Sequence, residues 1–158
     1  MELIPPGFSN LGLPPSLASC TRDTFHADTQ FSLDEVAMIA FQLADAMAHM
    51  HAKQVSHGDV YAHNIMVNQQ MNLLFGDFGA ASNLRNLSTV ERLAMEAIEV
   101  RALGCLIEDL LAYVSGSVGP EYYKKLSAIK DECMQLDVTQ RPCFADVKKA
   151  IGALLKGK

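Results

Sequence analysis

The chain has 158 residues, of which 49% are hydrophobic and 20% are charged. This composition excludes an intrinsically disordered chain, and the length suits one domain with an apolar core. The formal net charge of -5 and the pI near 5.4 give no sign of a nucleic-acid-binding surface. We therefore expect no nucleic-acid partner.

The cysteines and the N-terminus indicate the compartment. The cysteines form no C-x-x-C pair and no metal-binding spacing, so we expect reduced and mostly buried thiols. The chain starts MELIPP, which has no basic region and no apolar stretch long enough for a signal peptide or a membrane span. These features predict a soluble cytoplasmic protein without membrane association.

Residues 1–31 are rich in proline and glycine, which predicts an extended and irregular segment. Pro14 and Pro15 are expected to open a short helix over residues 16–20, because proline suits the first turn of a helix. For residues 7–12 a disordered linker is an equal alternative.

The best-supported helix begins at Ser32. Ser32 and Glu35 form a capping box, and apolar residues then recur at helical spacing to about Lys53. This apolar stripe is expected to face the core. His49 and His51 lie near the helix C-terminus, where the helix dipole favours a basic side chain, and we expect them at the surface.

A polar loop follows this helix and leads into a hairpin. The loop ends in HGDVYAHN, and two short apolar runs, 65–67 and 73–75, flank a turn before Gly-Asp-Phe-Gly. A hairpin brings its two outer ends together. Asp59 and Asn64 are therefore expected to lie near Asp77.

Two carboxylates and an amide at one place offer only oxygen ligands, which suit Mg²⁺ better than zinc. Mg²⁺ held by one or two protein oxygens and completed by phosphate oxygens is typical of phosphoryl-transfer sites. The loop and hairpin therefore indicate a phosphate-handling site. The alternative is an unrelated helical domain with a chance polar hairpin.

The second half of the chain is predicted to be helical. Ser88 and Glu91 form a second capping box, and a helix is expected to start there and to run, with or without a break, into the apolar segment 98–114. Pro120 is expected to open a helix to about residue 136, and a final helix is expected over residues 143–155.

The ordered motifs, H-G-D followed by four residues and Asn, then D-F-G after a hairpin, resemble those of protein kinases. HGDVYAHN and GDFGAAS are most similar to the kinase halves of bacterial leucine-rich-repeat kinase proteins. EVRALG from Glu99 resembles the start of the central helix of the kinase C-terminal lobe, with glutamate in place of aspartate, and DVTQRP resembles the D-x-x-x-R-P turn.

The resemblance implies a fold that is mainly α with a small β-hairpin, the C-terminal (large) lobe of a protein-kinase-like fold. Residues 1–31 would be a hinge-like segment with a short helix, and residues 32–158 the helical lobe. Asp59 would be the catalytic base, aided by Asn64, and Asn64 and Asp77 would hold Mg²⁺ on the phosphates of ATP.

The resemblance also implies where the adenine lies. Residues 1–4 would be the hinge whose backbone receives it, with Glu2 and Ile4 as contacts, and Met66 would form the floor beneath it. Met66 is also interpreted as an ordinary core residue. His57 would bridge the catalytic loop, which the resemblance places at residues 57–64, to the D-F-G turn.

Departures from the family pattern affect regulation and the acceptor. Gly58 stands where many kinases have arginine, so switching by phosphorylation of Ser82, Ser88 or Thr89 is not expected. Tyr61 stands where serine/threonine kinases have a lysine. The H-G-D-x-x-x-x-N loop also occurs in small-molecule kinases of the aminoglycoside and choline type, so the acceptor class stays open.

The resemblance covers the C-terminal lobe alone, because the sequence contains no glycine-rich loop, strand lysine or paired helical glutamate. We therefore expect weak or no activity from this chain by itself. Three functions remain: a phosphotransferase lobe acting on protein hydroxyls when an N-lobe completes it, a non-catalytic binding module of the pseudokinase type, or a small-molecule kinase. Apolar surface near the hinge and Met66 is expected to bind an N-lobe-supplying partner or a second copy.

Overall fold

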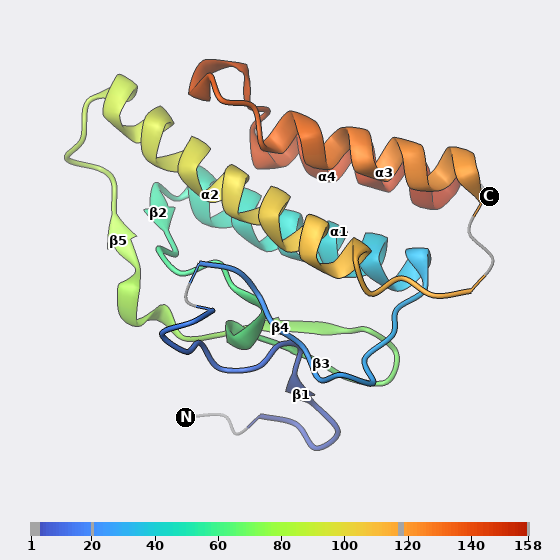
Figure 1. The fold of residues 1–158 in the computed structure, drawn as a ribbon. Helices are drawn as coiled ribbons and strands as arrows, with labels where there is room; N and C mark the ends of the chain where they lie inside the picture. The colour runs from blue at the N-terminus through green and yellow to red at the C-terminus, as the bar shows by residue number, and fades with distance from the viewer. Residues whose placement is uncertain (1–3, 20, 117–118, 158) are drawn as a thin grey trace.

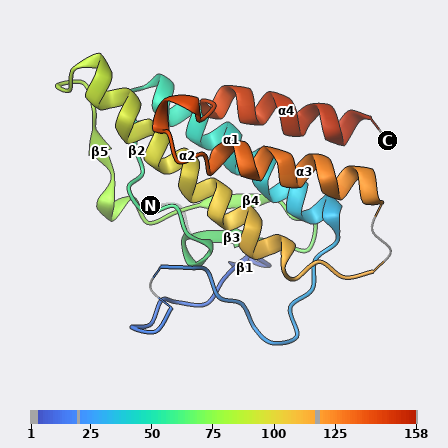
Figure 2. The same ribbon diagram turned by 45° about the horizontal axis from the view of Figure 1, so that its top comes forward.

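The computed structural model describes residues 4–19, 21–116 and 119–157. Over these ranges it contains four α-helices, α1 (Leu33–Ala52), α2 (Thr89–Leu111), α3 (Pro120–Cys133) and α4 (Phe144–Lys156). α1 packs against α2 and α4, and α2 packs against α3 (Figure 1). The strands and the N-terminal segment lie together on the side of α1 and α2 away from α3 and α4 (Figure 2).

Helix α1 confirms the strongest helix prediction. The Glu35 backbone N–H donates to the Ser32 hydroxyl at 3.2 Å, and the Ser32 N–H donates to the Glu35 carboxylate at 2.7 Å, so both halves of the capping box form. Most of the apolar stripe is buried in the core, with Val36, Ile39, Leu43 and Met47 all 0% exposed, whereas Met50 is half-buried.

Helix α2 is continuous from the second capping box to Leu111. The break that the sequence analysis allowed within this segment does not occur. Its second half, from Glu99, is buried in the middle of the molecule, whereas the first half carries several exposed side chains and extends beyond the other helices (Figure 1). The next helix, α3, ends at Cys133 and is shorter than predicted.

The predicted hairpin forms from β3 (Ile65–Val67) and β4 (Leu73–Phe75), with Ile65 opposite Phe75. Its turn is closed by the Asn68 side chain, which accepts from the backbone N–H of Gln70 at 3.0 Å and of Asn72 at 2.9 Å.

The described residues form more β-structure than the single predicted hairpin. β1 (Ser9–Asn10) pairs with the outer side of β3, and β2 (Val55–Ser56) pairs with β5 (Ser82–Asn83) in a second sheet. The β2–β5 pair joins the strand that leads into the catalytic loop to the segment that follows Gly79. Residues 7–12 are therefore in part an ordered strand, and the disordered alternative is wrong for that part.

The short helix predicted over residues 16–20 does not form over its described residues, 16–19, which make a turn instead. The Ser16 and Ser19 hydroxyls lie 2.9 Å apart, and the Ser16 N–H donates to the Ser19 hydroxyl at 3.2 Å. Serine side chains that bond to nearby backbone compete with helix formation, which explains the turn.

Among the described residues, no helix has both the length and the apolar character required to cross a membrane.

Candidate functional site

The loop over residues 57–64, here called the candidate catalytic loop, is anchored by the buried carboxylate of Glu99 on α2. Glu99 Oε1 accepts from the backbone N–H groups of His57 at 2.8 Å and Gly58 at 2.6 Å. Glu99 Oε2 lies 2.7 Å from His51 Nε2 at the end of α1. The longer side chain noted in the sequence therefore does reach the loop backbone, and a buried charge has the several partners it requires.

His51 contradicts its prediction. It was expected at the surface, but it is buried at 9% exposure, bonded to Glu99 and in edge contact with the ring of Phe144. The prediction assumed that the helix dipole alone explained a basic residue near the helix end. The actual partner of His51 is Glu99, which lies 48 residues further along the chain. His49 is exposed, as expected.

His57 joins the candidate catalytic loop to Gly76, the residue that follows β4. The Asp59 backbone N–H donates to His57 Nδ1 at 3.3 Å, which leaves the hydrogen on Nε2 to donate to the Gly76 carbonyl at 2.9 Å. The ring is fully buried and stacks on Phe75 with centroids 3.9 Å apart. The loop and the hairpin end are thereby held in one position relative to each other.

Gly58 allows the loop to approach the segment after Gly79. Its φ is +83°, and a Cβ added at this position would lie 2.5 Å from the Ala80 carbonyl oxygen. Both features require glycine, because an L side chain disfavours this backbone region and the contact is with backbone. The structure thus explains why no arginine stands here.

Asp59 and Asn64 are in direct contact. Asn64 Nδ2 donates to Asp59 Oδ2 at 2.8 Å and to the Asp59 carbonyl at 3.0 Å. The amide nitrogen is thereby used within the loop, and the amide oxygen Oδ1 is the atom that can serve a ligand. Asp59 remains half-buried, and His63 Nε2 lies 3.9 Å from its Oδ2.

The hairpin brings the backbone next to Asp77 against Asn64. The Gly76 N–H donates to the Asn64 carbonyl at 3.0 Å, so Asp77 is the residue after the one that bonds Asn64. Asp77 is exposed and adopts the left-handed conformation at φ 54°, and its Oδ1 accepts from the Gly79 N–H at 3.2 Å. Non-glycine residues in this conformation are uncommon and concentrate at functional sites.

The donor set suits a hard cation. Among the described residues no group of three or more His, Cys, Asp and Glu side chains is placed to hold a metal ion. The available oxygens are those of two carboxylates and one amide, which is enough for Mg²⁺ when phosphate oxygens and water complete its octahedron.

The predicted adenine contacts are only partly placed. Glu2 lies outside the described residues. Ile4 is 56% exposed and belongs to no strand or helix. Met66 is half-buried in the middle strand of the three-stranded sheet, and its Cε would lie 3.7 Å from a Cβ added at Gly76, so its side chain reaches toward the Asp77 turn.

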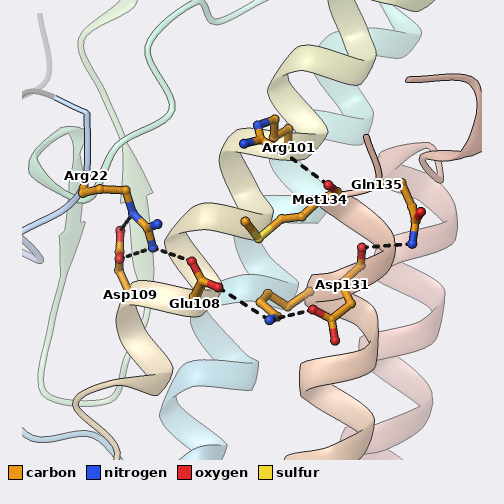
Figure 3. A network of polar contacts seen from close by, with 8 residues as sticks. Arg22, Arg101, Glu108, Asp109, Asp131, Met134 and Gln135 are labelled. Carbon is orange, nitrogen blue, oxygen red and sulfur yellow. Dashed lines mark hydrogen bonds and ion pairs between the residues drawn. The ribbon is translucent and has the colours of Figure 1, made fainter. Parts of the chain in front are cut away.

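A second anchor of the loop was not predicted. Asp23 Oδ1 accepts from the backbone N–H of Ala62 at 2.7 Å, and the Asp23 N–H donates to Asp109 Oδ2 at 3.1 Å. Arg22 donates through Nε to Asp109 at 3.0 Å and through Nη2 to Glu108 at 2.7 Å (Figure 3). No local sequence signal identifies these residues, since Asp23 and Ala62 are 39 positions apart.

Burial raises the pKa of Asp23 from 3.8 to about 6, and neighbouring Asp109 adds to the shift, while the Ala62 hydrogen bond, His63 and Arg22 oppose it. A carboxyl group whose pKa rises on folding stabilises the folded chain below its unfolded pKa and loses that contribution as pH rises through its folded pKa.

Asp23→Asn is therefore expected to gain stability relative to wild type as pH rises from 5 to 7.5, by about 1 kcal/mol after allowance for solvent access. Urea unfolding of both proteins at the two pH values measures this difference. Groups with lowered pKa, such as Glu108, cancel because both proteins carry them. An equal difference at both pH values would contradict the expectation.

Comparison with known proteins identifies a family model over most of this site. Residues 16–102 match the model described as "Protein kinase domain". "Serine/threonine-protein kinase A-Raf" of Homo sapiens is 36% identical over 56 residues, 35% of this chain and 9% of that protein. "Probable serine/threonine-protein kinase glkA" of Dictyostelium discoideum is 30% identical over 77 residues, 49% of this chain and 15% of that protein. The chain thus matches only a small part of the length of these relatives.

Proposed function

This chain belongs to the protein kinase domain family, and on that premise we propose that it is the C-terminal lobe of an ATP-dependent phosphotransferase. With Mg²⁺, and completed by an N-terminal lobe, it transfers the γ-phosphoryl group of ATP to a protein hydroxyl. The observation that carries the proposal is the hydrogen-bonded Asp59–Asn64 pair beside Asp77.

Each residue of this cluster has a proposed task. Asp59 orients the acceptor hydroxyl and takes its proton as the oxygen attacks the γ-phosphorus, whose bond to the bridging oxygen breaks to release ADP. Asn64 Oδ1 and the Asp77 carboxylate hold Mg²⁺, which when bound neutralises charge on the phosphates. Met66 lies beneath the adenine, and Glu2 and Ile4 supply the hinge contacts.

The wider arrangement supports this proposal. Glu99 and His57 hold the catalytic loop and the hairpin end together, and such preorganisation supplies most of the rate in phosphoryl transfer. We propose residues 1–31 as the hinge-like segment and residues 32–158 as the lobe. The similarity of HGDVYAHN and GDFGAAS to bacterial leucine-rich-repeat kinase proteins is proposed as the finer relationship.

A partly exposed apolar surface supports binding of an N-lobe or another partner. A cavity of about 580 Å³ is lined by Met50, Leu73, Leu74, Phe75 and Phe78 together with polar residues of α1. Phe78 is 55% exposed although it is large and apolar. Patches of this kind usually mark interfaces, so we propose that an N-lobe-supplying partner covers it.

A reducing cytoplasmic location fits the same proposal. The cysteines that the structure describes, Cys105, Cys133 and Cys143, are all free thiols. Cys133 is buried, whereas Cys105 is half-buried and Cys143 is exposed, so the expectation of mostly buried thiols is wrong for the described cysteines. Burial raises the pKa of the Cys133 thiol to about 12, so this thiol is unreactive.

Thermal unfolding with and without ATP and Mg²⁺ tests the nucleotide site. A ligand that binds only the folded chain stabilises it by about 2.7 kcal/mol at a hundredfold excess over Kd. We expect a Mg²⁺-dependent rise in Tm for wild type and its loss in Asp77→Asn.

Asp131→Asn is the matched control, because Asp131 is exposed on α3 and pairs with Lys130 at 2.6 Å. It should keep the full nucleotide-dependent rise in Tm. If wild type shows no rise at millimolar nucleotide, or if Asp77→Asn keeps it, the proposed Mg²⁺-ATP site is wrong.

A non-catalytic binding module is the second candidate, and one observation favours it. The first half of α2 exposes Val90 at 78%, Leu93 at 54% and Ile98 at 56%. A module that works through such contacts needs no Mg²⁺-ATP site, so a wild-type chain that folds but shows no nucleotide-dependent rise in Tm would favour this candidate.

A further inference from the structure

We infer that Asp23 is a positioning residue that holds the catalytic-loop turn bearing Asn64, although it lies in the segment before α1. Its effect on nucleotide binding rests on the proposed function. Its effect on the turn does not.

The turn is a single 3₁₀ helix over Ala62–Asn64, and it is fixed at both ends. At its start the buried Ala62 donates its N–H to Asp23 Oδ1 at 2.7 Å. At its end the Asn64 carbonyl accepts from the Gly76 N–H at 3.0 Å. A buried backbone N–H without a partner is costly, so removal of the Asp23 carboxylate frees the turn to move at the end away from the hairpin.

Asp23 is itself held by Asp109, which belongs to a network of charges around Arg22 (Figure 3). Asp109 on α2 accepts from the Asp23 N–H and from Arg22, and Arg22 also bonds Glu108. The ion pair between Glu108 and Lys130, at 3.6 Å, extends the network to α3. Asp23 therefore links the candidate catalytic loop to α2 directly and to α3 through Glu108 and Lys130.

A contribution to global stability alone does not explain why residue 23 is an aspartate. Burial raises the pKa of Asp23 to about 6, so its ionised form opposes folding at neutral pH. The same ionised form makes a charge-assisted hydrogen bond to Ala62, about twice as strong as a neutral one. The charge therefore costs global stability and tightens the local turn, so the two effects of its removal have opposite signs.

Amide hydrogen exchange of the full chain at pH 7.5, followed by NMR, tests this separation. In Asp23→Ala we expect the protection of the Ala62 amide to fall by about tenfold or more. Asp23→Asn keeps an oxygen acceptor and should lie between wild type and Asp23→Ala. Protection of the Leu43 amide in α1, which reports global opening, should stay the same or rise in Asp23→Asn.

Asp131→Asn is the control within the same network. It removes a charge from the Lys130 pair and leaves the Ala62 bond intact, so Ala62 protection should equal that of wild type. Ala62 protection within twofold of wild type in Asp23→Ala would overturn the inference. An equal loss at Ala62 and Leu43 in Asp23→Asn would also overturn it, because Asp23 would then act only on global stability.

Calorimetric titration with ATP and Mg²⁺ tests the functional consequence. Residues that orient a metal ligand typically change metal affinity by about 10–100-fold, and we expect Asp23→Asn to weaken Mg²⁺-dependent ATP binding by about tenfold. Unchanged binding with a loosened turn would show that the turn is not needed for the ligand. If wild type binds no nucleotide, the proposed function fails, while the exchange result still decides whether Asp23 holds the turn.

Discussion

Replacing Glu99 with alanine is expected to lower the free energy of unfolding by about 3–5 kcal/mol, the range for breaking a buried charged network. The carboxylate accepts from His57 N, Gly58 N and His51 Nε2, and alanine would leave these donors buried without it. Urea unfolding followed by circular dichroism measures the change.

Two further variants keep this prediction testable if Glu99→Ala does not fold. Glu99→Gln retains an oxygen for the loop amides and should lose less than Glu99→Ala. Glu96→Ala, in the same helix, removes the i,i+4 pair with Arg92 and should cost about 0.3–0.5 kcal/mol. A loss in Glu99→Ala as small as that of Glu96→Ala would mean that Glu99 does not anchor the catalytic loop.

Gly58→Ala has the second largest expected effect, a loss of about 3 kcal/mol. A φ of +83° disfavours any L side chain by about 1–2 kcal/mol. The new Cβ would also lie 2.5 Å from the Ala80 carbonyl oxygen, and relief of that overlap requires a backbone shift that costs about 1–3 kcal/mol.

Gly7→Ala separates these two costs. Gly7 has a similar φ of +90°, but nothing lies within 4 Å of an added Cβ. Its replacement should therefore show only the conformational cost, about 1–2 kcal/mol, when both glycine variants are measured by urea unfolding followed by circular dichroism. Equal losses in the two variants would show that the close approach of Gly58 to Ala80 does not contribute.

The predicted helices and the hairpin depended on signals that lie within a few residues of each other. The capping boxes at Ser32 and Ser88 and the apolar repeat of α1 are local, so their elements formed at or within a few residues of the expected ends. The Asp59–Asn64 contact lies within one loop, and the approach of the Asp77 backbone to Asn64 follows from one hairpin, so both are short-range structures.

The failed or missing predictions concern contacts between distant parts of the chain. His51 is buried because Glu99, 48 residues away, lies against it. β1 forms because residues 9 and 10 meet β3, and a two-residue strand has no periodicity to read. Residues 16–19 turn because serine side chains bond their own backbone, which outweighed the proline signal.

Periodicity, capping and turn chemistry act over a few neighbouring residues, so these local signals were enough to predict the helices, the hairpin and the oxygen-bearing residues of the candidate site. The way the site is held depends on contacts between distant parts of the chain. Glu99 on α2 and Asp23 in the segment before α1 both bond the candidate catalytic loop, and only tertiary packing brings partners so far apart in sequence within hydrogen-bond distance.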